Sequence, residues 1–164
     1  MNGEKHTEFL EMLRRCSNIM FRVCYMFTDR KPESIKDLYQ DIVADAWVGY
    51  GSFRNKSAET TWIYRVALNR ALQNIRHSER RPRLVEMDDA ICASLSESAR
   101  DPLVERLYEL IDCLEPSDKA LILLYLDNQG ISRMAEINGC SKNTVKHRLT
   151  RIRNKLIEIN ENEQ

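Results

Sequence analysis

The chain has 164 residues, enough for one medium domain or two small ones, and the 43% hydrophobic content argues against a wholly disordered protein. The longest apolar run, Ala120–Leu126, has seven residues, far fewer than the roughly 20 that a membrane-spanning helix needs. The first thirty residues are charged throughout and have no apolar stretch of the signal-peptide type. We therefore expect a cytoplasmic protein.

The composition favours helices. Five glycines and four prolines leave few tight turns, and β-branched runs with a period of two are absent from the sequence. These features predict an all-α protein. The five cysteines include no C-x-x-C pair and fit neither a zinc site nor a disulfide framework, so we expect reduced thiols, no metal and no cofactor.

The net charge of zero conceals a strong pattern along the chain. Arg65–Arg83 holds six basic residues against one acidic residue, and Arg133–Lys155 holds seven against one. Leu84–Asp118, between them, holds ten acidic residues against two basic ones. Two basic blocks separated by an acidic one indicate two polyanion-binding surfaces joined by a linker. The alternative is that each block is a solvated helix face.

Three helices are predicted in the N-terminal half. Apolar residues recur at steps of three and four between Phe9 and Phe27, which predicts the first helix. Pro32 suits the first turn of a second helix. A third helix is expected from about Thr60, after the polar loop 54–59.

A linker is predicted between two helical domains. Pro82 ends the first half, and residues 83–100 are acidic, contain three serines and show weak periodicity, as flexible segments do. Pro102 and Pro116 then each open a helix. The expected organisation is a domain over residues 1–82, an acidic linker over 83–100 and a second domain over 101–164.

The second domain contains a helix-turn-helix pattern. Gly139 suits the end of a short helix because glycine can adopt a left-handed backbone, and Ser141 is well placed to cap the next helix. Apolar residues from Val145 to Ile159, at steps of four and three, predict the buried stripe of that helix. Its outer face could meet phosphates and base edges in the major groove of duplex DNA. The residues on that face are Lys142, Asn143, Lys146, His147, Thr150 and Arg151. A helical hairpin with a solvated basic face is the alternative.

The third helix carries a polar row with aromatic residues before it. Arg65, Asn69, Gln73 and Arg76 follow one another at steps of four, four and three. Guanidinium and amide groups suit phosphate and base-edge contacts, and aromatic rings beside them suit the stacking of unpaired bases. The rings concerned belong to Phe53, Trp62 and Tyr64. The alternative places Trp62 in the core and leaves the row solvated.

An acidic row is expected on the second helix. Asp37, Asp41 and Asp45 recur at steps of four, and we expect them opposite the apolar stripe. A solvated or partner-docking surface is favoured over a metal site, because no His or Cys lies nearby in the sequence.

Together the two halves resemble the extracytoplasmic function (ECF) sigma factors of bacterial RNA polymerase. Asp37-Leu38-Tyr39-Gln40-Asp41-Ile42-Val43-Ala44-Asp45-Ala46-Trp47 resembles region 2.2 of that family. Ser52-Phe53-Arg54 and the segment 61–72 resemble regions 2.3 and 2.4. The segment 114–156, with its helix-turn-helix, resembles region 4.

The resemblance implies a dissociable promoter-recognition subunit. Region 2.2 would dock on the clamp helices of the polymerase β′ subunit, and region 4 would meet the β flap. The docking residues would be Asp37, Leu38, Gln40, Asp41 and Trp47. The residues that capture flipped bases of the melted minus-ten element would be Arg54, Asn55, Lys56, Arg65, Asn69 and Gln73.

The remaining roles also follow from the resemblance. The outer face of the recognition helix would read the minus-thirty-five element. An anti-sigma factor is expected as a further partner, and a membrane-bound one would hold the chain at the inner membrane. Departures from the family pattern at Gly130, Ser132, Arg133, Asn138 and Gln73 prevent the transfer of a relative's promoter sequence.

Two other functions compete with this one. A stand-alone helix-turn-helix regulator would bind a duplex operator by itself, usually as a symmetric dimer. An enzyme is disfavoured, because the three histidines are scattered and the sequence contains no glycine-rich phosphate loop, H-E-x-x-H or G-x-S-x-G motif. We therefore expect no catalytic residues and no small-molecule substrate.

Overall fold

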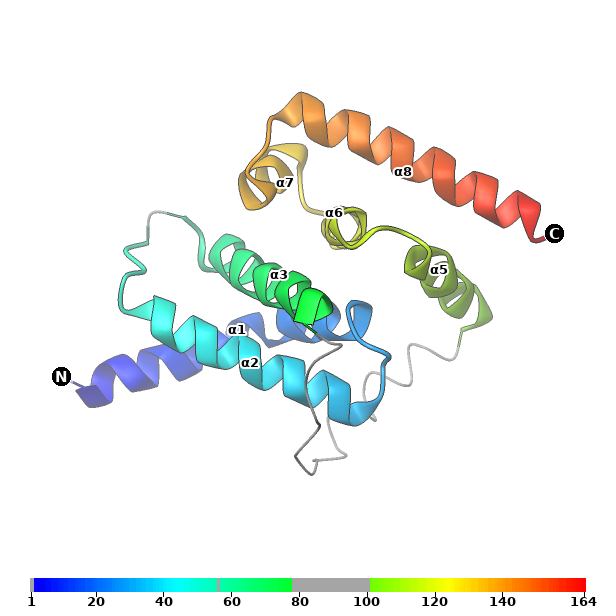
Figure 1. Cartoon of the computed structure of the whole chain (residues 1–164). Helices are drawn as coiled ribbons and strands as arrows, with labels where there is room; N and C mark the ends of the chain where they lie inside the picture. The colour runs from blue at the N-terminus through cyan, green and yellow to red at the C-terminus, as the bar shows by residue number, and fades with distance from the viewer. Residues whose placement is uncertain (1, 56, 78–100) are drawn as a thin grey trace. The chain divides into compact units, whose positions relative to one another are not determined.

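The computed structural model describes residues 2–55, 57–77 and 101–164, and within these ranges it contains seven α-helices and no strand (Figure 1). The chain divides into two compact units, Met1–Val85 and Glu86–Gln164. This confirms the predicted all-α fold with two helical domains. The predicted linker, 83–100, lies outside the described residues.

The N-terminal unit is a bundle of three helices, α1 (Asn2–Met26), α2 (Pro32–Tyr50) and α3 (Glu59–His77). Each helix packs against the other two. α1 is the longest, and the stripe predicted for it is buried through most of its length. Burial of each large apolar side chain contributes about 1.5–3 kcal/mol to the free energy of folding. Fully buried members of this core are Met12, Met20, Val23, Ile42 and Ile63.

Local features fix how these helices begin and end. Pro32 occupies the first turn of α2, as the sequence predicted. Near the other end of α2, a Cβ added to Gly49 would lie 3.2 Å from Cζ2 of Trp62, so glycine permits this close approach to α3. Arg15 on α1 forms an ion pair with Glu59 at the start of α3, with Nη2 2.9 Å from Oε1.

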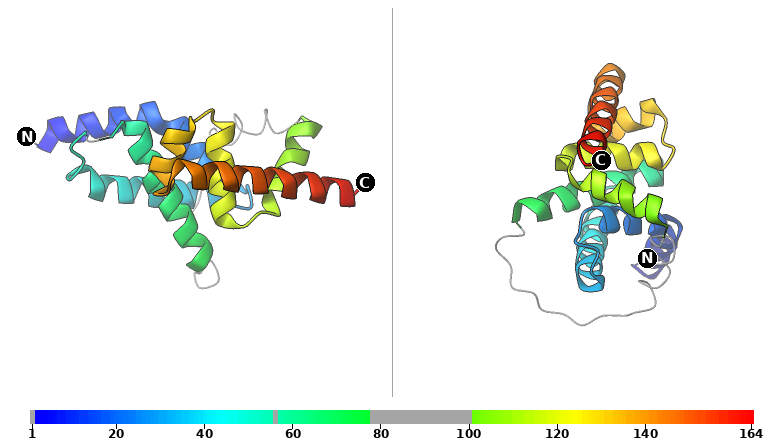
Figure 2. Two further views of the ribbon diagram at one scale, coloured as in Figure 1. Left: turned by 90° about the horizontal axis from the view of Figure 1, so that it is seen from above. Right: turned by 90° about the vertical axis from the view of Figure 1, so that its right-hand side faces the viewer.

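The C-terminal unit contains α5 (Pro102–Asp112), α6 (Pro116–Leu126), α7 (Ile131–Asn138) and α8 (Lys142–Asn162). α8 packs against α5, α6 and α7. Figure 2 shows this long helix lengthwise from above and foreshortened from the side of its C-terminus. Because α8 packs against several helices along its length, these contacts determine which of its faces is buried and which is exposed. Core residues of this unit include Ile111, Leu121, Leu124, Met134 and Ile152.

Prolines and polar contacts place the helices of this unit. Pro102 and Pro116 stand in the first turns of α5 and α6, as predicted. The Asp101 side chain caps α5 by accepting a hydrogen bond from the Leu103 N–H (2.9 Å). Arg106 on α5 forms an ion pair with Glu163, just beyond the last turn of α8 (2.6 Å).

Candidate nucleic-acid interface

The turn between α7 and α8 has the geometry that the sequence predicted. Gly139 ends α7 in the left-handed region with φ 65°, and the Cys140 N–H donates to the Ala135 carbonyl (3.1 Å). Ser141 caps α8, because its Oγ accepts a hydrogen bond from the Thr144 N–H (3.1 Å). The turn therefore holds the two helices of the helix-turn-helix in a defined orientation.

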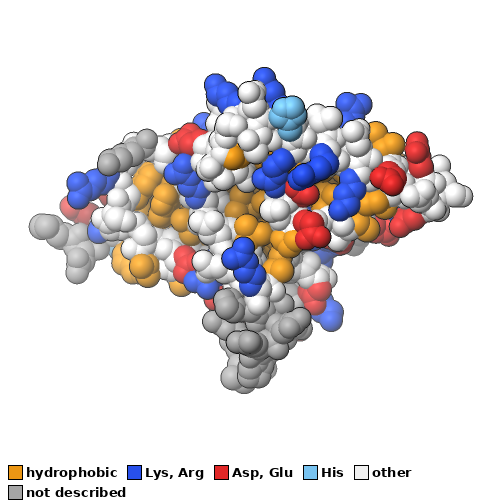
Figure 3. All heavy atoms as spheres, turned by 45° about the horizontal axis from the view of Figure 1, so that its top comes forward, with side chains coloured by type: hydrophobic (Ala, Val, Ile, Leu, Met, Phe, Trp, Pro, Cys, Tyr) orange, Lys and Arg blue, Asp and Glu red, His pale blue; other side chains and the backbone are white. Residues whose placement is uncertain are grey.

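The two faces of α8 differ sharply. Val145 and Ile152 are buried, whereas the whole predicted outer face is exposed. Figure 3 shows Lys and Arg side chains gathered over the C-terminal helices, with acidic side chains among them. The exposed outer-face residues are Lys142, Asn143, Lys146, His147, Thr150 and Arg151.

An acidic residue that the sequence analysis missed lies beneath this face. Asp118, in the first turn of α6, is only 7% exposed. Its Oδ1 accepts a hydrogen bond from Nη2 of Arg148 (3.0 Å) and lies 3.7 Å from Nη2 of Arg151. The available signal was a single acidic residue two positions after Pro116, ahead of the apolar run of α6.

The polar row of α3 is only partly open to solvent. Asn69, Gln73 and Arg76 are exposed, whereas Arg65 is half-buried and already has interactions within the chain. In the preceding loop, Arg54 and Asn55 are exposed, and Lys56 lies outside the described residues. Asn55 adopts a left-handed backbone with φ 53°, which asparagine tolerates better than most residues.

Aromatic rings connect this loop to the bundle. Phe53 stacks on Trp62, with ring centroids 4.9 Å apart and an interplanar angle of 26°. Tyr50 lies 6.4 Å from both rings and also contacts Phe9 of α1 (5.1 Å). The half-buried Trp62 is therefore part of a cluster that holds the loop against α2 and α3. The sequence left open whether this ring is available to stack on bases or lies in the core, and its position is between the two.

The acidic row of α2 does not lie opposite the core. Arg70 of α3 forms a bidentate ion pair with Asp45, and Nδ2 of Asn74 donates to Oδ2 of Asp41 (3.1 Å). The expectation of an outward acidic row is therefore wrong for these two residues. The physical reason is that α2 packs against both α1 and α3, so a larger arc of its surface is covered than the apolar stripe indicates.

The predicted polymerase-docking residues separate into buried and accessible ones. Leu38 is 4% exposed and belongs to the core, so the direct docking contact expected for it is wrong. Gln40 is exposed, Asp37 and Asp41 are half-buried, and Trp47 is 45% exposed.

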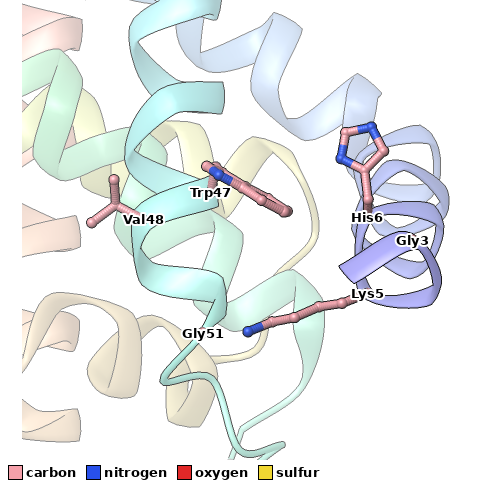
Figure 4. Close-up of a pocket in the computed structure, with 6 residues that line it drawn as sticks. All are labelled: Gly3, Lys5, His6, Trp47, Val48 and Gly51. Carbon is pink, nitrogen blue, oxygen red and sulfur yellow. The ribbon is translucent and has the colours of Figure 1, made fainter. Parts of the chain in front are cut away.

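Trp47 forms one wall of a pocket between the start of α1 and the end of α2 (Figure 4). Its indole contacts the His6 ring edge-on, at 5.6 Å between centroids, and also the Phe9 ring at 4.9 Å. The adjacent Val48 is 82% exposed and points away from the Trp47 ring. The pocket has a volume of about 710 Å³.

The described residues offer no site for a metal ion. Across residues 2–55, 57–77 and 101–164, no group of three or more His, Cys, Asp and Glu side chains could hold one. Cys16 and Cys24 are buried, Cys140 is half-buried and Cys113 is exposed. Burial raises the pKa of the Cys24 thiol to about 12. None of the described helices has the length and apolar character to cross a membrane.

Comparison with known proteins gives these surfaces a context. Residues 12–81 match the family described as Sigma-70 region 2, and residues 104–156 match Sigma-70, region 4. The ECF RNA polymerase sigma-E factor of Escherichia coli is 30% identical over 135 residues, which cover 73% of this chain and 70% of the relative. The chain belongs to the ECF sigma factors of RNA polymerase.

Other relatives agree with this assignment. The ECF RNA polymerase sigma factor SigM of Mycobacterium tuberculosis is 27% identical over 160 residues, which cover 96% of this ECF sigma factor and 79% of SigM. Among solved structures, the sigma factor RpoE in complex with the anti-sigma factor NepR from Bartonella quintana shares the fold. Its TM-score is 0.71 at 20% identity, and the similarity covers 96% of this chain and 99% of that chain.

Membership of the family establishes the general function. This chain is an RNA polymerase sigma factor that acts in transcription initiation with core polymerase and promoter DNA. Sigma factors are initiation factors and not an enzyme family. Because regions 2 and 4 are both present in order, a stand-alone helix-turn-helix regulator is not favoured.

Proposed function

We propose that this ECF sigma factor reads promoters with two DNA-binding surfaces and holds core polymerase with a third. The observation that carries the proposal is the exposed basic face of α8, which follows a fixed turn and lies opposite the buried Val145 and Ile152. A helix held in this way presents one row of side chains to a groove and cannot rotate to present another.

The upstream surface is the outer face of α8 and binds the minus-thirty-five element as a duplex. Lysine and arginine side chains there meet phosphates or guanine edges, and Asn143 and His147 have the hydrogen-bonding groups to reach base edges. The proposed contact residues are Lys142, Asn143, Lys146, His147, Thr150 and Arg151.

The downstream surface comprises the loop after α2 and the polar row of α3, and it captures unpaired bases of the minus-ten element. The exposed Asn69 and Gln73 on α3, together with the stacked rings of Phe53 and Trp62 at the loop, support this assignment. The proposed contact residues are Arg54, Asn55, Lys56, Arg65, Asn69 and Gln73.

The third surface is the accessible part of α2, through which the N-terminal unit docks on the β′ clamp helices. Its proposed residues are Asp37, Gln40, Asp41 and Trp47; the partly exposed indole of Trp47 supplies apolar area of the kind found at the centres of interfaces. In the same proposal the C-terminal unit meets the β flap, and residues 83–100 link a domain at 1–82 to one at 101–164.

An anti-sigma factor is the proposed regulatory partner. The solved RpoE relative that shares this fold is bound to an anti-sigma factor, which supports the idea. The proposal places the protein in the cytoplasm and assigns it no catalytic residue, no cofactor and no small-molecule substrate.

Transcription in vitro tests the proposal directly. Purified protein is added to core polymerase on a pool of promoter fragments, and gel shifts of the same pool are run with and without core. We expect specific transcripts and specific binding only when core polymerase is present. Tight, selective duplex binding by the protein alone would instead identify a stand-alone regulator.

A further inference from the structure

The buried carboxylate of Asp118 is placed to control two arginines of α8. Arg148 donates to its Oδ1 at 3.0 Å, and Arg151 reaches the same oxygen at 3.7 Å. Arg148 and Arg151 lie three residues apart and therefore on the same side of the helix. One carboxylate in the first turn of α6 thus attracts two guanidinium groups of the DNA-reading helix.

The two arginines differ in how far they are committed to this contact. Arg148 is half-buried and belongs to the junction between α6 and α8, whereas the Arg151 side chain is 69% exposed. A guanidinium group has five N–H donors, so Arg151 retains donors that can turn to a DNA phosphate. The carboxylate competes with the phosphate for this side chain.

Phosphate contacts strengthen binding to every sequence equally, because phosphates carry no base information. Limiting such contacts therefore lowers the sequence-independent affinity for DNA and leaves the preference among sequences unchanged. The charge of Asp118 beneath the reading face limits them, since it offsets one of the two positive charges beside it.

We propose that Asp118 is a positioning residue that limits sequence-independent DNA affinity: it draws Arg148 and Arg151 towards α6 and withholds part of their charge from the DNA backbone. The inference rests on the proposed function, in which α8 binds the upstream element. It adds that the strength of backbone binding by this helix depends on an acidic residue that touches no DNA.

The test uses the holoenzyme formed by the full chain with core polymerase. Wild type and Asp118→Asn are each incubated with linear duplex DNA randomised over the upstream element, at several salt concentrations, and the bound fraction is sequenced. The asparagine keeps an oxygen acceptor for Arg148 but removes the charge. We expect tighter binding to all sequences, a salt dependence steeper by about one and an unchanged sequence preference.

Two further variants separate this mechanism from a structural one. Asp112→Asn is the matched control, because it also removes a carboxylate from an ion pair of this unit, with Lys119 of α6 (3.1 Å). It should leave affinity and salt dependence unchanged. Arg151→Gln should lower the salt dependence by clearly less than one in the wild-type chain, because Asp118 weakens the phosphate contact of Arg151, yet cancel the gain when combined with Asp118→Asn.

The outcomes are distinguishable. If Asp118→Asn binds all sequences more weakly, or keeps the wild-type affinity and salt dependence, Asp118 is only a structural residue and the inference is wrong. If Asp118→Asn fails to fold, the Arg151→Gln single variant decides the question. A salt dependence shallower by about one in that variant would show that Arg151 already makes a full phosphate contact in the wild type, and the inference would be wrong. A wild-type holoenzyme with no upstream preference refutes the proposed role of α8 itself.

Discussion

Arg70 of α3 holds both carboxylate oxygens of Asp45 of α2, with its Nε 2.6 Å from Oδ2 and its Nη2 hydrogen-bonded to Oδ1. Both side chains are partly buried at the junction of the two helices. The hydrogen bonds from Arg70 to Asp45 raise the pKa of the guanidinium group. The pair fixes α3, which carries the proposed minus-ten surface, against α2, which carries the proposed polymerase surface.

We predict that Asp45→Asn destabilises the N-terminal unit by about 1–3 kcal/mol. The value is set below that for fully buried pairs, because water reaches both side chains. The loss arises from the charge of Arg70 left without its partner. Chemical denaturation followed by circular dichroism measures it.

A double-mutant cycle provides the control for this prediction. Adding Arg70→Gln to Asp45→Asn removes both charges and should recover part of the lost stability, because no unpaired guanidinium group remains. Strictly additive losses in the two single variants would contradict a direct coupling between them.

The helices and the helix-turn-helix were predictable from the sequence because their signals are local. Pro32, Pro102 and Pro116 mark helix starts, and Gly139 and Ser141 mark the turn before α8, each through the backbone geometry or hydrogen bonds of its immediate neighbours. The outer face of α8 followed from the same periodicity, since its buried residues define the exposed ones.

The polar contacts between helices were not predictable in the same way. Asp45 and Arg70 are 25 residues apart, and Asp118 and Arg148 are 30 apart. Which acid meets which base depends on how two helices pack, and periodicity on one helix does not contain that information. Leu38 is a different case: its docking role came from the family resemblance alone, whereas the structure places it in the core.

Charge reversal at Asp37 should weaken assembly with core polymerase and leave the fold intact. Asp37 is half-buried on the proposed docking surface of α2, and a lysine there would repel basic residues on the partner. We expect Asp37→Lys to be retained less by immobilised core polymerase, with an unchanged unfolding transition. Glu11→Lys, an equivalent reversal on exposed α1, is the control. Equal retention of the two variants would show that Asp37 does not contribute to binding of core polymerase.

Asn69→Ala should reduce the formation of open promoter complexes. Asn69 is exposed on α3, so the substitution removes an amide that can pair with a flipped base without creating a cavity. Permanganate reactivity of unpaired thymines measures opening. Asn18→Ala on exposed α1 is the control, and it should leave the footprint unchanged.

A pre-melted template separates base capture from melting. If Asn69 binds an unpaired base directly, Asn69→Ala should remain defective when the minus-ten strands are already separated. Full rescue on this template would limit the role of Asn69 to helping the duplex open.

The buried thiol of Cys24 should react only when the N-terminal unit opens. Its pKa is raised to about 12, mainly by burial and further by the nearby Asp41, so almost no thiolate forms at neutral pH. A water-soluble aromatic disulfide at pH 8, with the labelled cysteines identified by mass spectrometry, should modify the exposed Cys113 first. Labelling of Cys24 as fast as Cys113 would show that the unit is not closed.

The same shift gives a direction for the pH dependence of stability. The folded pKa of Cys24 lies above its unfolded value. The contribution of Cys24 to the free energy of unfolding is therefore complete below about pH 8.5 and declines as the pH rises towards 12. Cys24→Ala should therefore show a smaller loss of unfolding free energy over this alkaline range than the wild type, measured by denaturant titration at each pH.

Lys146→Ala tests whether the recognition helix reads bases. Lys146 is exposed in the second turn of α8, close to the N-terminal end that enters the groove, while Val145 beside it is buried and prevents the helix from turning. A base contact from Lys146 predicts a loss of about 1–3 kcal/mol on the preferred upstream element and a relaxed preference at one or two positions. Selection from a randomised upstream element by the holoenzyme measures both quantities.

Arg153→Ala is the matched variant for that experiment. Arg153 lies seven residues further along α8, on the same face and also exposed, but two turns away from the end that enters the groove. Its substitution should weaken binding equally for all sequences or leave it unchanged, because a residue in that position reaches only the phosphate backbone. If both variants keep the wild-type preference and Lys146→Ala also keeps the wild-type affinity, α8 does not select the promoter through Lys146. A preference altered by Arg153→Ala would instead mean that the helix lies in the groove along more of its length.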